Sequence, residues 1–169
     1  MATPRPVDPE SLCGPAVEAY PEDNYEPVRG VGALLGRLRG ELLTAIDAEL
    51  AAEERLAPLE VTSAQLIIIA NLAAQDGRRC VSDLCKGIQY DAGAMTRMID
   101  RLETKGLIQR ERCSNDRRLV YLELTEQGRE LYPTMREISR RVLNRFLRGF
   151  SREEAGQLEG YLRRMLANA

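Results

Sequence analysis

The stretch DAGAMTRMIDRLETKGLIQRERCSNDRRLVYLEL, residues 91–124, decides the fold of this chain. Asp91 is a residue type that often caps the start of a helix, and Gly106 is the type that often follows the last helical turn. Between them the apolar residues recur at helical spacing. The pattern predicts a helix whose buried face carries Met95, Met98, Ile99 and Leu102.

A β-hairpin is predicted directly after this helix. Residues 107–112 and 118–124 have the composition of strands, and Val120, Leu122 and Leu124 share one face of the second strand. The polar residues 113–117 between them form the hairpin tip, where Arg117 is followed directly by Arg118 at the start of the second strand. A helix followed by a basic-tipped hairpin is one half of a winged helix-turn-helix.

The residues upstream supply the other half. Thr62 and Gln65 have the spacing of a capping box, which opens a helix that continues over 66–74. Residues 78–80 can add a very short strand, and Ser82 caps a short helix with Val81, Leu84 and Ile88 facing inward. The predicted fold class is mainly α with a small β-hairpin wing (α+β).

The flanking segments divide the chain into four parts. Residues 1–26 are proline-rich and form an extended arm, and 27–57 hold a helix whose first turn contains Pro27 and which reaches about Ala52. The winged helix-turn-helix lobe occupies 58–124. Residues 125–169 hold two further helices, capped by Thr125 and by a capping box at Ser151. Both flanking parts have more apolar residues than one small lobe can cover.

The composition excludes several kinds of chemistry. The chain has 169 residues and no histidine, which rules out Ser-His-Asp catalysis and zinc sites that need histidine. Its four cysteines contain no Cys-x-x-Cys pair, so no metal and no cofactor is expected. The carboxylates Asp47, Glu49, Glu53 and Glu54 fit a solvated helix face, and we expect no enzyme activity. No signal peptide and no membrane-spanning run is present in the sequence, which favours the cytoplasm.

Charge is distributed unevenly along the chain. The net charge of the whole chain is −2, which by itself disfavours a nucleic-acid partner. Residues 1–77 carry a net charge of −8, whereas 78–118 carry +4 and 119–169 carry +2. The predicted lobe is therefore basic, and double-stranded DNA becomes a candidate partner.

The outer face of the predicted helix has the residue types that a DNA major groove requires. Small residues near its N-terminus allow close approach to phosphate, and donors further along can contact bases or phosphates. At the hairpin tip an arginine can enter the minor groove, where an adjacent acid orients it. The candidate DNA-binding residues are Ala92, Gly93, Thr96, Arg97, Arg101, Asp116, Arg117 and Arg118.

Residues 91–108 resemble the recognition helix and first wing strand of MarR-type regulators. Asn115 to Arg118, followed by Thr125 to Gly128, is similar to the wing of that family and the start of its next helix. The resemblance covers roughly residues 28–166. It implies a homodimer whose terminal helices interlock and whose two lobes bind a pseudo-palindromic operator. By matching position it implies that Thr96, Arg97 and Arg101 contact the major groove, and that Arg118, braced by Asp116, contacts the minor groove.

The same resemblance implies a transcriptional repressor that a small aromatic or phenolic acid releases from DNA. Arg110 and Thr96 match positions that contact salicylate in the protein after which the family is named. A deeper pocket would be lined by the first helix, the 65–70 helix and the long helix. Its candidate residues are Leu35, Leu38, Arg39, Gln65, Ile68 and Ile69. The alternative is that the apolar residues are plain core and that Arg39 forms a surface salt bridge.

Two other functions are compatible with the sequence. Cys13 lies near two tyrosines upstream of the first helix, and Cys113 lies beside arginines that favour its thiolate, so a thiol-responsive repressor is one alternative. The other is a winged-helix module that mediates protein contacts and does not bind DNA.

Overall fold

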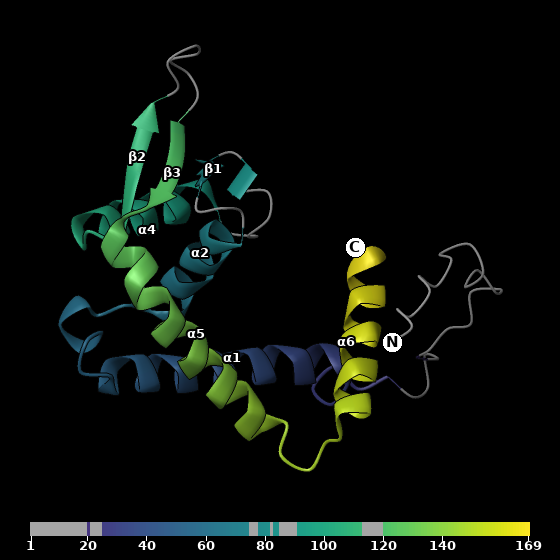
Figure 1. Cartoon of the computed structure of the whole chain (residues 1–169). Helices are drawn as coiled ribbons and strands as arrows, with labels where there is room; N and C mark the ends of the chain where they lie inside the picture. The colour runs from purple at the N-terminus through teal and green to yellow at the C-terminus, as the bar shows by residue number, and fades with distance from the viewer. Residues whose placement is uncertain (1–19, 21–24, 75–77, 82, 85–90, 113–119) are drawn as a thin grey trace, which may run out of the picture. The chain divides into compact units, whose positions relative to one another are not determined.

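The computed structural model describes residues 20, 25–74, 78–81, 83–84, 91–112 and 120–169 (Figure 1). Its helices are α1 (Val31–Ala52), the 3-10 helix η3 (Ala57–Leu59), α2 (Ser63–Ala73), α4 (Ala92–Thr104), α5 (Glu126–Phe146) and α6 (Arg152–Ala167). Its strands are β1 (Arg78–Cys80), β2 (Ile108–Arg112) and β3 (Val120–Leu124). The chain is mainly α-helical with a small antiparallel sheet, which confirms the predicted winged-helix fold.

The sheet has the strand order β1-β3-β2, and all its pairs are antiparallel. Ile108 lies opposite Leu124 and Arg112 lies opposite Val120, so β2 and β3 pair along their whole lengths. The very short strand at residues 78–80 is confirmed as β1. In Figure 1, β2 and β3 project beyond the helices α2 and α4. Residues 113–119, which contain the predicted hairpin tip, lie outside the described residues.

Four helices begin at side-chain caps that the sequence predicts. In each case a side-chain oxygen accepts a backbone N–H of the first helical turn, which would otherwise have no partner. The acceptors and distances are Thr62 for Gln65 (3.3 Å), Asp91 for Ala94 (2.8 Å), Thr125 for Gly128 (3.0 Å) and Ser151 for Glu154 (3.2 Å). At Ser151, the hydrogen bond from its backbone N–H lowers the pKa of the Glu154 carboxyl.

Helix α1 begins at Val31 and not at Pro27, where the sequence places the first turn. The carbonyl oxygen of Glu26 accepts the N–H groups of Arg29 and Gly30, both at 3.0 Å, and so closes a separate turn before the helix. The N–H of Val31 is donated to the hydroxyl of Tyr20 at 3.0 Å. A long-range cap thus marks the start of α1, and no local pattern of residues encodes it.

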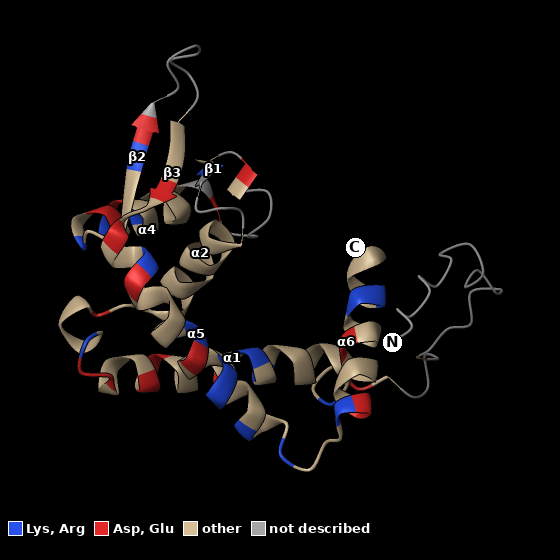
Figure 2. Ribbon diagram, in the orientation of Figure 1, with Lys and Arg blue, Asp and Glu red and all other residues tan. Residues whose placement is uncertain are grey.

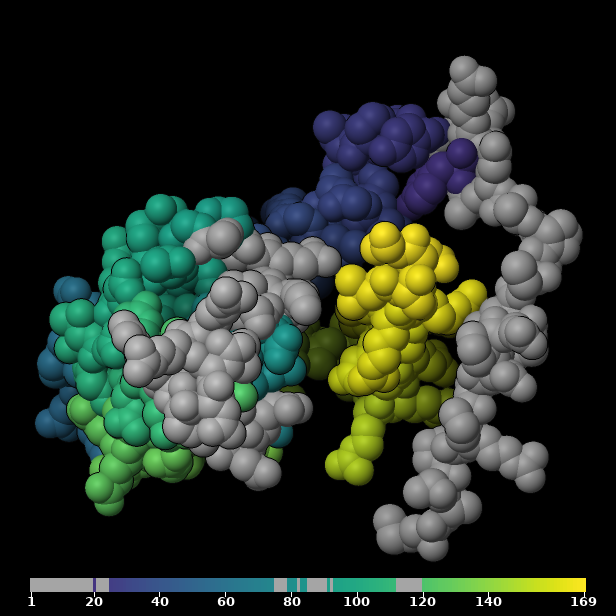
Figure 3. Space-filling view, turned by 90° about the horizontal axis from the view of Figure 1, so that it is seen from above, coloured from purple at the N-terminus to yellow at the C-terminus, as the bar shows by residue number. Residues whose placement is uncertain are grey.

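The hydrophobic core lies within residues 39–169, among α2, α4, α5 and the sheet. Figure 3 shows the residues of α4 in teal and those of β3 and the start of α5 in green within one continuous block. The predicted inward residues of α4 are buried except Met98, which is half-buried. Largest among the fully buried side chains are Leu50, Leu56, Ile68, Ile69, Leu72, Leu84, Met95, Ile99, Leu102, Leu107, Ile108 and Leu122.

Two carboxylates of α1 bind neighbouring helices, and the prediction that they form a solvated face is wrong for them. Asp47 accepts the backbone N–H of Ser63 at 2.5 Å, at the start of α2. Glu49 accepts hydrogen bonds from Arg141 at 2.7 Å and Arg145 at 3.0 Å, both on α5. The hydrogen bond from Arg141 is the main cause that lowers the pKa of Glu49. These contacts join α1 to α2, which follows it along the chain, and to α5, which lies about 90 residues further on.

The turn between α4 and β2 packs directly against the start of α5. Gly106 has a φ of +69°, a left-handed conformation that favours glycine. The Leu107 carbonyl accepts the N–H of Thr125 at 3.1 Å, and the Thr125 hydroxyl donates to the Gly106 carbonyl at 2.6 Å. A Cβ atom on Gly128 would overlap the carbonyl oxygen of Leu107. Position 128 therefore requires glycine.

The chain divides into two compact units, residues 1–38 and residues 39–169, and the boundary falls within α1. Among the described residues, no helix combines the length and the apolar character that crossing a membrane would require.

We expect Gly128→Ala to destabilise the fold by about 1–3 kcal/mol, because the added methyl group would clash with backbone atoms that cannot move without disturbing their hydrogen bonds. Gly156→Ala is the matched control, since a Cβ there meets nothing within 4 Å. Gly156 also lies on the side of α6 opposite Leu158 and Met165. The control should be neutral or more stable by up to about 1 kcal/mol. Urea unfolding followed by circular dichroism measures both variants, and equal stability of the two would contradict the packing argument.

Candidate nucleic-acid interface

Helix α4 presents one buried face and one exposed face. Met95, Ile99 and Leu102 are buried in the core. The exposed face carries the predicted contact residues Thr96, Arg97 and Arg101, together with Asp100. The guanidinium groups of Arg97 and Arg101 form no ion pair with the residues that the structure describes. Both groups are available to an anion from outside the chain.

The first turn of α4 leaves little space for a side chain at Gly93. A Cβ atom at this position would lie 3.2 Å from Oδ1 of Asp91 and 3.4 Å from Nη1 of Arg97. A side chain would therefore crowd both the cap of the helix and the nearest exposed arginine. Gly93 is exposed, and the close approach of a phosphate to the backbone at this position stays a prediction. The backbone of Ala92 begins the helix beside it.

Arg110 on β2 bridges two carboxylates of α4. Its Nη2 atom donates to Asp100 at 2.5 Å, and its Nη1 atom donates to Glu103. The hydrogen bond from Arg110 to Asp100 is the main cause that raises the pKa of Arg110. Figure 2 shows acidic and basic residues intermixed on α4 and β2. This bridge joins the exposed face of α4 to the first strand of the wing, and no local spacing rule predicted it.

Lys105 fixes the other end of α4. Its Nζ atom donates to the carbonyl oxygen of Glu60 at 2.7 Å and to Oε1 of Gln65 at 2.9 Å. Burial is the main cause that lowers the pKa of Lys105. The end of α4 is thus joined to the start of α2 by a partly buried cation. No short-range pattern in the sequence predicts this role, because the partners lie 40 or more residues away.

The predicted contacts of the hairpin tip remain predictions. Asp116, Arg117 and Arg118 lie outside the described residues, as does Cys113. The structure does place the two strands that lead to the tip. Arg112, the last residue of β2, lies opposite Val120, the first residue of β3.

The predicted ligand residues differ in their environments. Ile68 and Ile69 are fully buried in the core. Gln65 is also buried, and its Oε1 atom accepts from the N–H of Thr62 as well as from Lys105. Leu35 is half-buried, while Leu38 and Arg39 are exposed. Burial and the capping contacts give Ile68, Ile69 and Gln65 structural roles, and their contact with a ligand stays a prediction.

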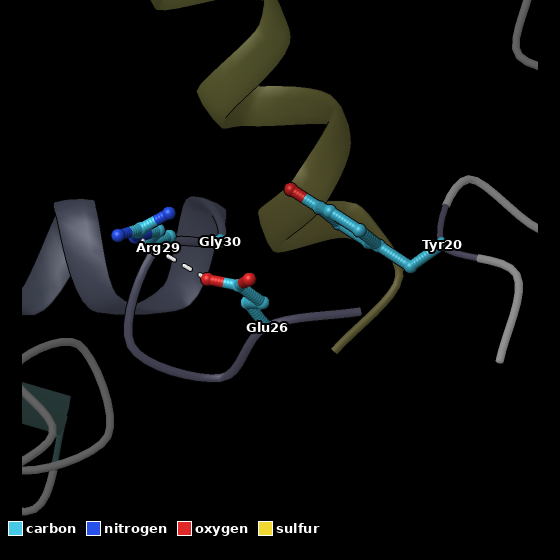
Figure 4. A pocket seen from close by; sticks show the side chains of 4 residues that line it. All are labelled: Tyr20, Glu26, Arg29 and Gly30. Carbon is cyan, nitrogen blue, oxygen red and sulfur yellow. Dashed lines mark ion pairs between the residues drawn. The ribbon is translucent and has the colours of Figure 1, made fainter. Parts of the chain in front are cut away.

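A small cavity occurs in the unit formed by residues 1–38. Tyr20, Glu26, Arg29 and Gly30 line this space of about 380 Å³ (Figure 4). Glu26 and Arg29 form an exposed ion pair at 3.3 Å, and the rings of Tyr20 and Tyr25 meet edge-on with centroids 5.5 Å apart. None of the predicted DNA or ligand residues lines this cavity.

Comparisons with known proteins point to one family. Residues 61–120 match the model of the MarR family. The matched segment contains α2, α4 and β2, and therefore the capped helix and the Arg110 bridge described above.

Solved structures with the same fold extend this match. MarR from Escherichia coli, as a mutant complexed with operator DNA, is 25% identical with a TM-score of 0.69, covering 80% of this chain and 92% of that chain. BpsR from Bordetella bronchiseptica, whose DNA binding is regulated by 6-hydroxynicotinic acid, is 24% identical with a TM-score of 0.71 over 86% and 98% of the two chains. PcaV from Streptomyces coelicolor, in complex with its natural ligand, is 21% identical with a TM-score of 0.70 over 86% and 96%.

Proposed function

We propose that the chain, a MarR-family DNA-binding transcriptional regulator, acts as a homodimeric repressor. A small aromatic or phenolic acid releases this repressor from a pseudo-palindromic operator. The observation that carries the proposal is the exposed face of α4, where Arg97 and Arg101 form no ion pair with the described residues. The helix that carries this face is capped at its N-terminus by Asp91, and its C-terminal end is joined to α2 through Lys105.

In this function α4 enters the major groove and the hairpin tip contacts the minor groove. The fixed N-terminus at Gly93 approaches a phosphate, and side chains further along the helix contact base edges. Similarity to a MarR structure complexed with operator DNA supports this arrangement. The proposed contacts are Ala92, Gly93, Thr96, Arg97 and Arg101 on α4, and Asp116, Arg117 and Arg118 in the tip.

Exposed apolar side chains support a second copy of the chain as partner. On α6 they are Leu158, Tyr161, Met165 and Leu166, and on α1 they are Val31, Leu34 and Leu38. Apolar stripes of this kind on helices are typical of surfaces that another chain covers. We assign residues 27–57 and 125–169 to dimerisation, 58–124 to DNA binding and 1–26 to an arm. A two-fold dimer presents two α4 helices to two half-sites.

The ligand proposal draws its support from two proteins that share the fold: BpsR, whose DNA binding is regulated by 6-hydroxynicotinic acid, and PcaV, whose structure contains its natural ligand. In this chain Arg39 is the candidate partner for a carboxylate, together with Leu35 and Leu38 on the same helix. An acid that instead used Arg110 would have to compete with Asp100 and Glu103 for its guanidinium.

No contact of the described residues favours the thiol-responsive alternative, since Cys13 and Cys113 lie outside them. The alternative of a protein-interaction module without DNA binding does not fit a DNA-binding regulator.

Loss of one predicted DNA contact should weaken binding and reduce its salt dependence. We expect Arg97→Ala and Arg118→Ala each to lower affinity for promoter duplex by about tenfold, and a lost phosphate contact to reduce the slope of log K against log salt by about 1. Fluorescence anisotropy with DNA from upstream of the gene encoding this chain measures both. Arg163→Ala is the control, because Arg163 pairs with Glu159 on exposed α6. If all three variants bind like the unchanged protein, the proposed contacts are wrong.

Binding of an aromatic acid should stabilise the protein by mass action. With salicylate at about 100 times its Kd, the melting temperature should rise by about 5–10 °C, and the same concentration should release promoter DNA. Arg39→Gln should abolish both effects, while Arg37→Gln, an exposed arginine two residues earlier on the same helix, should retain them. If neither salicylate nor a panel of hydroxycinnamates and hydroxynicotinates changes either readout, the ligand proposal fails.

A further inference from the structure

Helix α4 is electrically neutral by itself, which is unexpected for a helix that binds a polyanion. Its charged residues are Arg97 and Arg101, offset by Asp100 and Glu103. Asp100 lies directly before Arg101 in sequence and is exposed, so its charge lies on the face proposed to meet DNA. Without a compensating cation, two carboxylates next to phosphates would oppose binding by like-charge repulsion.

Arg110 supplies that cation from a different element. Two separate nitrogen atoms of its guanidinium bind the two carboxylates, one each. Asp100 and Glu103 are three residues apart and therefore lie on one side of α4, where a single planar fork can reach both. The main chain of Arg110 is held in β2 opposite Leu122 of β3, so the bridge begins on paired sheet and ends on the helix.

We propose that Arg110 is a positioning residue of the DNA-binding surface, which neutralises Asp100 and Glu103 and fixes α4 relative to the wing strand β2. This inference rests on the proposed use of α4 in DNA binding. The four charged residues of α4 sum to zero, and the guanidinium of Arg110 brings the net charge of this group to +1. Arg97 and Arg101 stay available to DNA. The bridge also assigns Arg110 a role that does not require a ligand.

The bridge contributes to binding more than to folding. The side chains of Arg110, Asp100 and Glu103 retain 32%, 55% and 39% of their exposure, and exposed ion pairs add little to stability. Variants of these residues should therefore fold. A guanidinium has the geometry to bind two acids at once, whereas the ammonium of lysine is a point charge. We expect Arg110→Lys to retain only part of the effect.

The test is a mutant cycle on Arg110 and its two carboxylate partners, in which the measured quantity is the affinity for promoter DNA. Arg110→Gln should bind promoter duplex about tenfold more weakly than the unchanged protein, because two carboxylates lose their partner. The double variant Asp100→Asn/Glu103→Gln should bind at least as tightly as the unchanged protein. The triple variant, which combines all three substitutions, should bind within about threefold of the unchanged protein. It should thus regain the affinity that Arg110→Gln alone loses. Removal of the two carboxylates should raise affinity more in the Arg110→Gln background than in the unchanged protein, whereas a direct DNA contact of Arg110 would give equal gains in both backgrounds.

Arg140→Gln is the matched control, because Arg140 is an exposed arginine on α5 that binds Glu137 through two nitrogen atoms. Arg140 is not among the exposed apolar side chains of α1 and α6 that we propose for dimerisation, and light scattering checks that the variant keeps the oligomeric state of the unchanged protein. It should leave affinity unchanged. The melting temperature of every variant should lie within a few degrees of that of the unchanged protein. A random-sequence duplex of equal length separates general electrostatics from specific binding.

Several outcomes overturn the inference. Unchanged affinity in Arg110→Gln refutes it, and so does failure of the triple variant to regain affinity. Intact DNA binding in Arg110→Gln with loss of release by salicylate would show a ligand contact and not a positioning residue. If the unchanged protein binds no duplex from its promoter, the proposed function fails and the inference fails with it, whereas the other results refute the inference alone.

Discussion

The close approach of Gly128 to the carbonyl of Leu107 is the constraint on which the rest of the lobe depends. At this point the end of α4, the start of β2 and the start of α5 meet within a few residues. The Leu107 carbonyl accepts the N–H of Thr125, and the Thr125 hydroxyl binds the Gly106 carbonyl. Because a single methyl group cannot be inserted there, the direction of α4 is set relative to both the sheet and the long helix. These contacts fix the end of α4 against the sheet and the start of α5.

Around this junction, polar contacts from distant residues hold α4 in place. Lys105 joins its end to the start of α2, and Arg110 joins its exposed side to β2. Also at the start of α2, Asp47 of α1 accepts the N–H of Ser63. The chain thus uses charged groups both to fix its helices and to present charge outward. A net charge of −2 is compatible with a DNA partner because the acids near α4 have partners inside the chain.

The sequence predicted the features that depend on neighbouring residues. The caps at Thr62, Asp91, Thr125 and Ser151, the left-handed Gly106 and the strands around residues 108–124 are all short-range patterns, and the structure confirms them. It did not predict contacts between distant segments. The Tyr20 cap moves the start of α1 to Val31, and Asp47 and Glu49 bind other helices instead of water. Residue type does not encode such pairs when the partners are far apart in sequence.

We propose that α4 and the wing of two chains bind one face of a DNA duplex. Hydroxyl-radical footprinting on promoter DNA measures which face is covered. We expect two protected patches on one face of the duplex, centred about one helical turn or a multiple of it apart, each flanked by protection in a neighbouring minor groove. A single unpaired patch, or uniform protection without periodicity, would contradict it.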